Sequence, residues 1–153
     1  MPALILPSAT IANSSYFRNS FSDKTYKIGK DWNPLAFSES GKSQVDQLIF
    51  AGYGLRLPEK SNFQGYDSYT HLDVKDKWVL CLRKLPKKWD QEIKDQFYYH
   101  STLRKKASVA RDLGAKGIIF ISDNNESDGL VIPFNQSTRE KISIQAISIS
   151  YEL

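Results

Sequence analysis

The side chains that could do chemistry in this sequence are two histidines and a group of aspartates. His71 lies between Asp67 and Asp73, and His100 stands in a later segment. Histidine and aspartate together can bind a metal ion or act as general acid and base. However, neither histidine has a second one at helical spacing, and the aspartates, Asp76 included, occupy turn-like stretches where carboxylates commonly accept backbone hydrogen bonds. We therefore expect no catalytic, metal-binding or cofactor-binding residues, and a small autonomous metal-dependent hydrolase using these residues is the alternative.

A glycine pair, Gly52 and Gly54, flanks Tyr53 and begins like a dinucleotide-binding fingerprint. The fingerprint fails because Leu57 replaces its third glycine and Pro58 follows, so no helix is expected to open there and bind a pyrophosphate. The sequence also lacks a Walker-type phosphate loop, because Ala36 stands where the first glycine of that loop would precede Gly41-Lys42-Ser43. The Gly-x-Ser-x-Gly pattern of serine hydrolases is absent as well. Glycines at these positions instead suit a backbone that turns sharply or approaches another segment closely.

Tyrosines in loops are the candidate contact residues. Tyr66 and Tyr69 flank Asp67, and the pair Tyr98 and Tyr99 precedes an expected helix. Tyrosines in such places often anchor protein contacts. Packing in the core is the alternative for all four. We predict that these tyrosines, together with Asp67, contact a partner or substrate.

The composition limits the kinds of partner. No apolar run approaches the roughly 20 residues that span a bilayer, so no membrane partner is expected. The net charge is +4, with basic clusters at residues 84–88 and 104–106 and an acidic stretch at 123–128. A nucleic-acid binder would show a basic stripe with interleaved aromatics, so we expect solvated surface and no nucleic-acid partner. Binding of nucleic acid or an anionic surface through the two basic clusters is a third hypothesis. The single Cys81 is expected to be a small buried residue.

The clearest structural signal is a strand–helix–strand unit. Trp78–Leu82 and Gly117–Ile121 are apolar throughout, as is typical of strands covered on both faces. Between them, a helix is predicted with Ser101 or Thr102 as its cap and Gly114 as the left-handed residue after its end. Its apolar stripe consists of Leu103, Ala107, Ala110 and Leu113. We expect parallel strands joined by a right-handed crossover.

Weaker signals surround this unit. Residues 45–50 predict one short strand ending in Leu48–Phe50, and residues 84–100 predict either a loose helix or an ordered loop. Short apolar pieces near residues 16–17, 26–28 and 35–37 predict edge strands. Near the end of the chain, the apolar alternation changes phase at residues 146–147, which predicts a bulge or break there.

Three motifs, in order, resemble the protease-associated (PA) domain of di-zinc aminopeptidases. They are FAGYGL at residues 50–55, YDSY at 66–69 and LDVKDKWVL at 72–80. The helix and strand at residues 106–119 and the strand at 146–150 look like the same family, although Gln145 stands where the family usually has proline. The resemblance covers roughly residues 25–150. The resemblance implies a structural role for six motif residues: Gly52, Tyr53, Gly54, Asp73, Lys77 and Gly114.

The resemblance implies an α/β fold of the swivelling β/β/α type. Such a fold has a parallel central sheet, a second antiparallel β layer and one main packing helix. Residues 1–24 would be an N-terminal lead-in, either flexible or packed at the edge, and residues 25–153 would form the PA-like domain. The opening residues do not form a clear signal peptide.

The resemblance also implies a function. PA domains are non-catalytic modules that shape substrate access to a peptidase or mediate its protein and peptide interactions. The expected partners are the peptidase catalytic domain of the same parent protein and a peptide or protein substrate. Zinc is expected only in that peptidase domain, so no cofactor is expected in this chain. The implied location is extracytoplasmic, either secreted or periplasmic.

Overall fold

The computed structural model describes residues 4–6, 16–19, 25–41, 43–122, 131–133 and 140–150. The acidic stretch at 123–128 lies outside the described residues. The strands are β1 (Leu4–Leu6), β2 (Tyr16–Asn19), β3 (Thr25–Lys27), β4 (Trp32–Pro34), β5 (Ser43–Val45), β6 (Leu48–Phe50), β7 (Arg56–Leu57), β8 (Tyr66–Asp67), β9 (Trp78–Leu82), β10 (Gly117–Ile121) and β11 (Gln145–Ile149). The helices are α1 (Gln91–Gln96), the 3₁₀ helix η1 (Tyr98–Ser101) and α2 (Leu103–Asp112).

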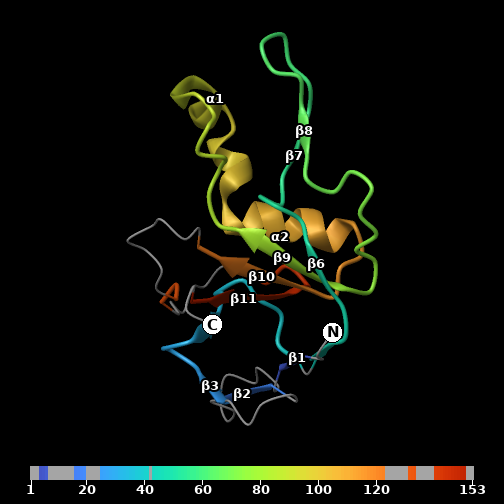
Figure 1. Ribbon diagram of the computed structural model, residues 1–153, viewed down its shortest axis with the longest axis vertical. Helices are drawn as coiled ribbons and strands as arrows, with labels where there is room; N and C mark the ends of the chain where they lie inside the picture. Colours follow the sequence, from blue (N-terminus) through green and yellow to red (C-terminus); the bar gives the residue numbers. More distant parts are fainter. Residues whose placement is uncertain are drawn as a thin grey trace.

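A five-stranded sheet forms the centre of the molecule, in the order β4-β11-β10-β9-β6 (Figure 1). Strands β6, β9, β10 and β11 are parallel, and only β4 runs antiparallel, against β11. Strands β9 and β10 are buried along nearly their whole length, as their continuous apolar sequences predict. The predicted strand–helix–strand unit is confirmed.

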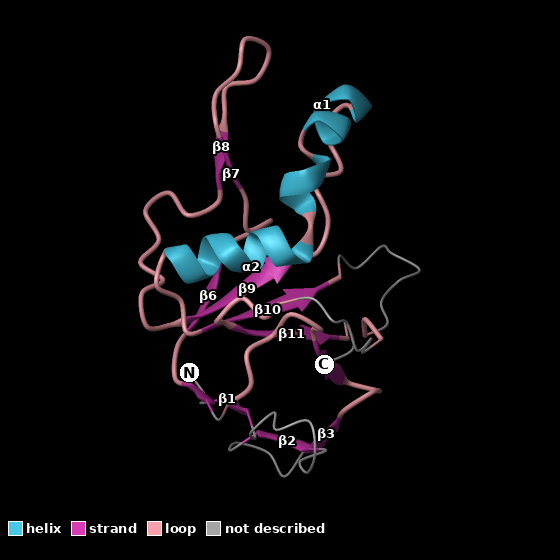
Figure 2. Cartoon of the chain, turned by 180° about the vertical axis from the view of Figure 1, so that it is seen from behind, coloured by secondary structure: helices cyan, strands magenta, loops and turns pink. Residues whose placement is uncertain are grey.

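Helix α2 covers one face of this sheet (Figures 1 and 2). Its start is capped by the Thr102 side chain, which accepts a hydrogen bond from the backbone N–H of Lys105 at 3.3 Å. After its end, Gly114 adopts a φ of +85°, the left-handed conformation predicted for it. Ala107 and Ala110 are fully buried against the sheet in a core that includes Val79. Small side chains let the helix lie close to the strands.

A second sheet lies on the other side, with strand order β3-β2-β1-β5 and antiparallel pairing throughout. In the described residues, Val45 of β5 packs into a cluster with Trp78 and Ile119 of the central sheet. The result is the layered α/β fold expected from the sequence. Residues 4–6 and 16–19 are strands of this second sheet, while the proposed boundary at residue 24 stays a prediction.

A projecting part extends from the body beyond α2 (Figures 1 and 2). It consists of the β7–β8 hairpin with its long loop, and of α1 with η1, so residues 84–100 contain both a loop and short helices. Its buried centre, here called the outer cluster, is formed by Leu55, Leu57 and Phe97. Packed around these residues are Tyr53, Phe63, Tyr66, Leu85, Trp89 and Ile93.

Three predictions about strands are wrong. Residues 35–37 form no strand, because β4 ends at Pro34 and a turn follows it. Strand β11 pairs continuously with β10, from Gln145 opposite Gly117 to Ser148 opposite Phe120, so there is no break at residues 146–147. The change of phase arises because the strand is buried on both faces. Residues 45–50 do not form one strand either: Val45 ends β5 in the second sheet, and Leu48 begins β6 in the central one.

Candidate functional site

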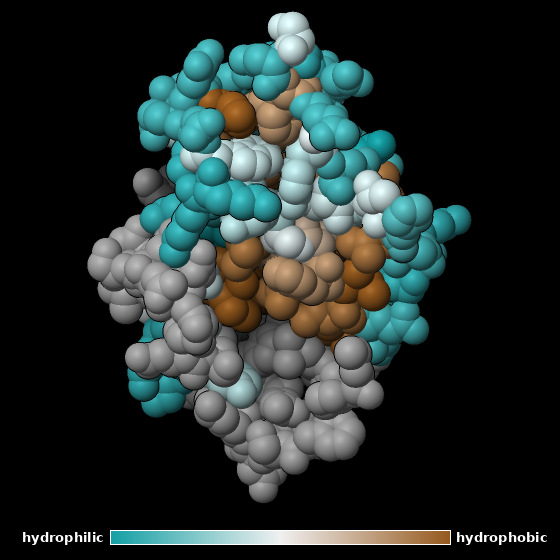
Figure 3. All heavy atoms as spheres, turned by 45° about the horizontal axis from the view of Figure 1, so that its top comes forward, coloured by the Kyte–Doolittle hydropathy of each residue, from teal (hydrophilic) through white to brown (hydrophobic). Residues whose placement is uncertain are grey.

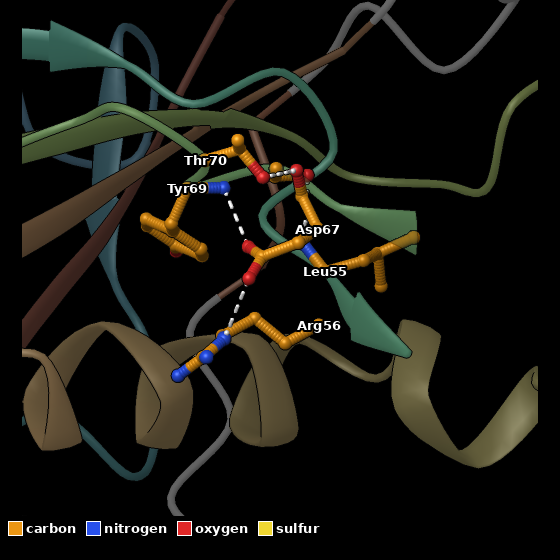
Figure 4. Close-up of polar contacts among 6 residues, drawn as sticks. Leu55, Arg56, Asp67, Tyr69 and Thr70 are labelled. Atoms are coloured by element: carbon orange, nitrogen blue, oxygen red, sulfur yellow. Dashed lines mark hydrogen bonds and ion pairs between the residues drawn. The ribbon is translucent and has the colours of Figure 1, made fainter. Parts of the chain in front are cut away.

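The YDSY motif forms the base of the β7–β8 hairpin, and Asp67 holds it together (Figure 4). One carboxylate oxygen of Asp67 accepts a hydrogen bond from the backbone N–H of Tyr69 at 2.8 Å, and the other pairs with the Arg56 guanidinium at 3.0 Å. The Thr70 hydroxyl donates to the backbone carbonyl of Asp67 at 3.2 Å. The Asp67 carboxylate therefore stabilises a turn, and contact with a partner stays a prediction for it.

The four tyrosines predicted to make contacts divide into three environments. Tyr98 and Tyr99 are 72% and 68% exposed. Tyr66 is half-buried and meets the Trp89 ring edge-on, with 5.3 Å between ring centroids. Tyr69 is only 5% exposed and belongs to the core under α2, so packing, the alternative interpretation, describes it. Of the four, Tyr98 and Tyr99 are the ones that face solvent, and contact with a partner stays a prediction for them.

The Gly-Tyr-Gly motif lets one loop approach the end of β9. Gly52 and Gly54 have φ values of +52° and +64°, and the Gly52 carbonyl accepts a hydrogen bond from the backbone N–H of Leu82 at 2.8 Å. A Cβ on Gly54 would lie 2.6 Å from the Cys81 sulfur and 3.5 Å from the Tyr69 hydroxyl. The motif is thus required by packing, in agreement with its failure as a nucleotide fingerprint.

Cys81 and Tyr69 are buried together beside this loop. Burial raises the pKa of the Cys81 thiol to about 12, and burial also raises the pKa of Tyr69 well above its ordinary value. Both groups are therefore neutral near pH 7. A thiol that is protonated and buried is a poor nucleophile, so this pair serves packing rather than covalent chemistry.

The LDVKDK motif is a turn that leads into β9. Lys77 Nζ pairs with the Asp73 carboxylate at 2.6 Å and also donates to the Asp73 backbone carbonyl at 2.9 Å. The other carboxylate oxygen accepts from the backbone N–H of Lys75 at 3.2 Å. These contacts, led by the hydrogen bond from Lys77, lower the pKa of Asp73. Asp73 and Lys77 thus fix the start of the central strand.

The two histidines lie in different environments. His71 has a φ of +64° in the exposed turn after YDSY, whereas the His100 ring lies edge-on to the Phe97 and Tyr99 rings. Burial lowers the pKa of His100, and the charges of Lys105 and Lys60 lower it further. Among the described residues, no three side chains of His, Cys, Asp or Glu gather in a group that could hold a metal ion.

Lys106 belongs to the basic cluster at residues 104–106, which the sequence predicts to be solvated. That prediction is wrong for Lys106, because this residue is 0% exposed. Its ammonium donates three hydrogen bonds of 2.9 Å to the consecutive backbone carbonyls of Leu82, Arg83 and Lys84. Burial lowers its pKa to about 8. Its sequence position carried the signal, because residue 106 lies on the same helical stripe as Leu103 and Ala110.

A groove opens beside the three carbonyls that Lys106 binds. It has a volume of about 570 Å³, which is in the range of small-ligand sites. Basic residues from the end of β9, the following loop and α1 line one part of it: Arg83, Lys84, Lys87 and Lys94. The remaining lining comes from Leu85, Tyr98, Ser101, Thr102, Leu103 and Ile132. The sequence shows that residues 84–88 are basic, but not that Tyr98 and Ser101 of η1 line the same groove as Lys84 and Lys87.

The surface around the projecting part is mostly polar. Figure 3 shows hydrophilic side chains over much of this part and an apolar area near the middle of the same face. Among the described residues, no helix is long and apolar enough to cross a membrane.

The molecule is an α/β domain with layered sheets and a packing helix. Its sequence motifs form turns that hold these elements in place. A family model of the PA domain matches residues 38–153, which is more than half of the chain. The chain therefore belongs to the PA domain family. PA domains are typically accessory, non-catalytic domains.

A solved structure similar to the chain is BSAP, a zinc aminopeptidase from Bacillus subtilis. The sequences are 20% identical, the TM-score is 0.45, and the match covers 99% of this chain and 28% of that chain. The chain thus spans less than a third of the length of that enzyme. Comparison with curated proteins gave no match.

Proposed function

We propose that this chain is the non-catalytic PA module of a zinc aminopeptidase that acts outside the cytoplasm. The module would shape access of substrates to the peptidase site, or hold a peptide or protein partner near it. Membership of the PA family carries this proposal. The FAGYG, YDSY and LDVKDK motifs, which resemble those of aminopeptidase PA domains, support the choice of parent enzyme.

The arrangement of the motif residues agrees with a binding role. The ionic and hydrogen-bonding capacity of Asp67 and Asp73 is used within turns, and Cys81 is buried and protonated. The projecting part exposes Tyr98 and Tyr99 to solvent, and a groove lies beside it. In this proposal the chain itself binds no zinc, and the catalytic domain of the parent protein is its first partner.

Mixing this chain with a zinc aminopeptidase catalytic domain from the same source tests the proposal. We expect association, together with a change in kcat/KM that is larger for long peptides than for aminoacyl model substrates. Metal analysis of the chain alone should find no stoichiometric zinc. Zinc-dependent peptidase activity of the chain alone would instead establish the autonomous hydrolase, and absence of any association or kinetic effect would refute the module.

A further inference from the structure

The groove at the end of β9 combines positive charge with an apolar floor. Among the described residues that line it, four are basic, none is acidic, and Leu85, Leu103 and Ile132 supply apolar surface. A pocket of this kind suits a ligand with negative charges beside an apolar group. A site that bound only a phosphate group would need no apolar surface beside its basic residues.

Two cations at this site have neutral partners only. Within the described residues, Lys94 Nζ, which lines the groove, donates to the backbone carbonyl of Lys87 at 2.9 Å. Lys106 is fully buried beside the groove and donates to three carbonyls, two of which belong to the lining residues Arg83 and Lys84. Carbonyl oxygens orient these ammonium groups without cancelling their charge. The positive potential therefore extends into the groove, where water is partly excluded and charges interact more strongly than in bulk solvent.

The walls of the groove are held in place. The Arg83 guanidinium donates to Ser148 Oγ at 2.7 Å and to the Ile149 carbonyl at 3.0 Å, which ties the end of β9 to β11. Helix η1 places Tyr98 at the groove, and this residue is 72% exposed. A large aromatic side chain that is held by its backbone but not buried is a typical contact anchor.

We propose that this groove binds a short acidic peptide segment carrying at least one apolar side chain. Its carboxylates would lie against Lys87 and Lys94, and its apolar side chain would pack on Leu103 under the Tyr98 ring. This deepens the proposed function, because it assigns peptide contact to one surface and states which peptides that surface selects.

Two matched pairs of variants test the groove. Lys87 lines it, whereas the exposed Lys88 in the same loop does not; likewise Tyr98 lines it, whereas the equally exposed Tyr99 does not. Calorimetric titration of the 153-residue chain at about 0.15 M salt, where distant charges are screened, would use an acidic peptide of alternating Glu and Leu. Two further probes are the same peptide with Lys in place of Glu and a single-stranded oligonucleotide.

We expect the acidic peptide to bind and the lysine peptide not to bind. K87E and Y98A should each weaken binding by roughly tenfold, which is the scale of one contact anchor, while K88E and Y99A change it less than threefold. Absence of acidic-peptide binding, equal effects of K87E and K88E, or tighter binding of the oligonucleotide would each overturn the proposal. Because no peptidase is present, these outcomes are independent of whether the chain acts on an aminopeptidase.

Discussion

The backbone of Gly54 lies against the thiol of Cys81, so closely that a Cβ on Gly54 would stand 2.6 Å from the sulfur. The φ of Gly54, +64°, is also one that other residues adopt at a cost. We therefore expect G54A to lower the free energy of unfolding by about 2–4 kcal/mol, the sum of backbone strain and overpacking. Urea unfolding followed by tryptophan fluorescence measures this loss.

Gly29 provides the matched control, because its φ is +82° but a Cβ there would meet nothing within 4 Å. G29A should thus cost only the backbone term, about 1 kcal/mol. Combining G54A with C81A should recover part of the loss, since the smaller side chain removes the clash with sulfur. If G54A and G29A lowered the free energy of unfolding equally, the close approach of residue 54 to Cys81 would add no destabilisation, which would contradict this prediction.

Removal of the buried ammonium should destabilise the fold. K106M leaves three consecutive carbonyls without their donor, and we expect a loss of about 1–3 kcal/mol after the relief of charge burial is included. K105M, which changes the adjacent half-buried lysine, should cost less than about 0.5 kcal/mol. Equal losses in the two variants, measured by urea unfolding at pH 7, would contradict the structural role of Lys106.

The lowered pKa of Lys106 also predicts a pH dependence. Folding lowers that pKa from 10.5 to about 8, so between these values the unfolded chain binds more protons than the folded one. The burial of the Lys106 charge therefore carries an unfavourable free energy that is constant below pH 8 and becomes smaller as pH rises above 8, while the hydrogen bonds to the three carbonyls keep the total contribution favourable. The difference in unfolding free energy between wild type and K106M should grow from pH 7 to pH 9.5. Cys81 and Tyr69 are present in both proteins, so most of their own contribution to the pH dependence of stability cancels in this difference. A difference that stays flat would mean that Lys106 titrates normally.

The Cys81 thiol should be unreactive in the native protein. Burial and a pKa of about 12 keep it protonated at pH 8, so an aromatic disulfide reagent should label it only through opening of the structure. We expect labelling within seconds in 6 M guanidinium and at least about a hundredfold more slowly in buffer, as is usual for a buried thiol whose exposure requires unfolding. Rapid stoichiometric labelling of the native chain would show that the thiol is accessible.

Asp67 should act through its turn more than through its ion pair. D67N retains the oxygen that accepts from the Tyr69 N–H and loses only the exposed pair with Arg56, so we expect a cost below about 1 kcal/mol. D67A loses both contacts and should cost about 1 kcal/mol more than D67N. Thermal unfolding of both variants and of R56A separates the two terms, and equal effects of D67N and D67A would contradict the importance of the turn.

Strands β9 and β10 and helix α2 could be predicted because single, strong local signals specify them. Residues 78–82 and 117–121 are apolar throughout, which predicts strands that are covered on both faces. Thr102 and Gly114 mark the two ends of the helix. By contrast, the strand at residues 145–149 has an irregular apolar pattern, because β10, β4 and both covering layers contact it. A change of phase predicts a bulge only for a strand with one buried face, and this strand is buried on both.

The site was harder to predict, since it depends on segments that meet only in the folded chain. Lys106 and Lys105 are neighbours in a basic run, and only the phase of the helix distinguishes the buried Lys106 from the half-buried Lys105. The groove likewise needs η1 to place Tyr98 over the loop at residues 83–87. The acceptors of Lys106 are backbone carbonyls, which leave no mark in a sequence.

The outer cluster has a consequence for motion. Leu55, Leu57 and Phe97 form a small core that is distinct from the cores on the two faces of the central sheet. Elements held by separate, small amounts of apolar contact open at lower free energy than the rest of a domain. Amide hydrogens of α1 and the β7–β8 hairpin should therefore exchange with solvent through local opening, while those of β9 and β10 wait for the whole chain to unfold. A partner that seats on the projecting part would then be detected as slowed exchange there, even where no atom of the main body shifts.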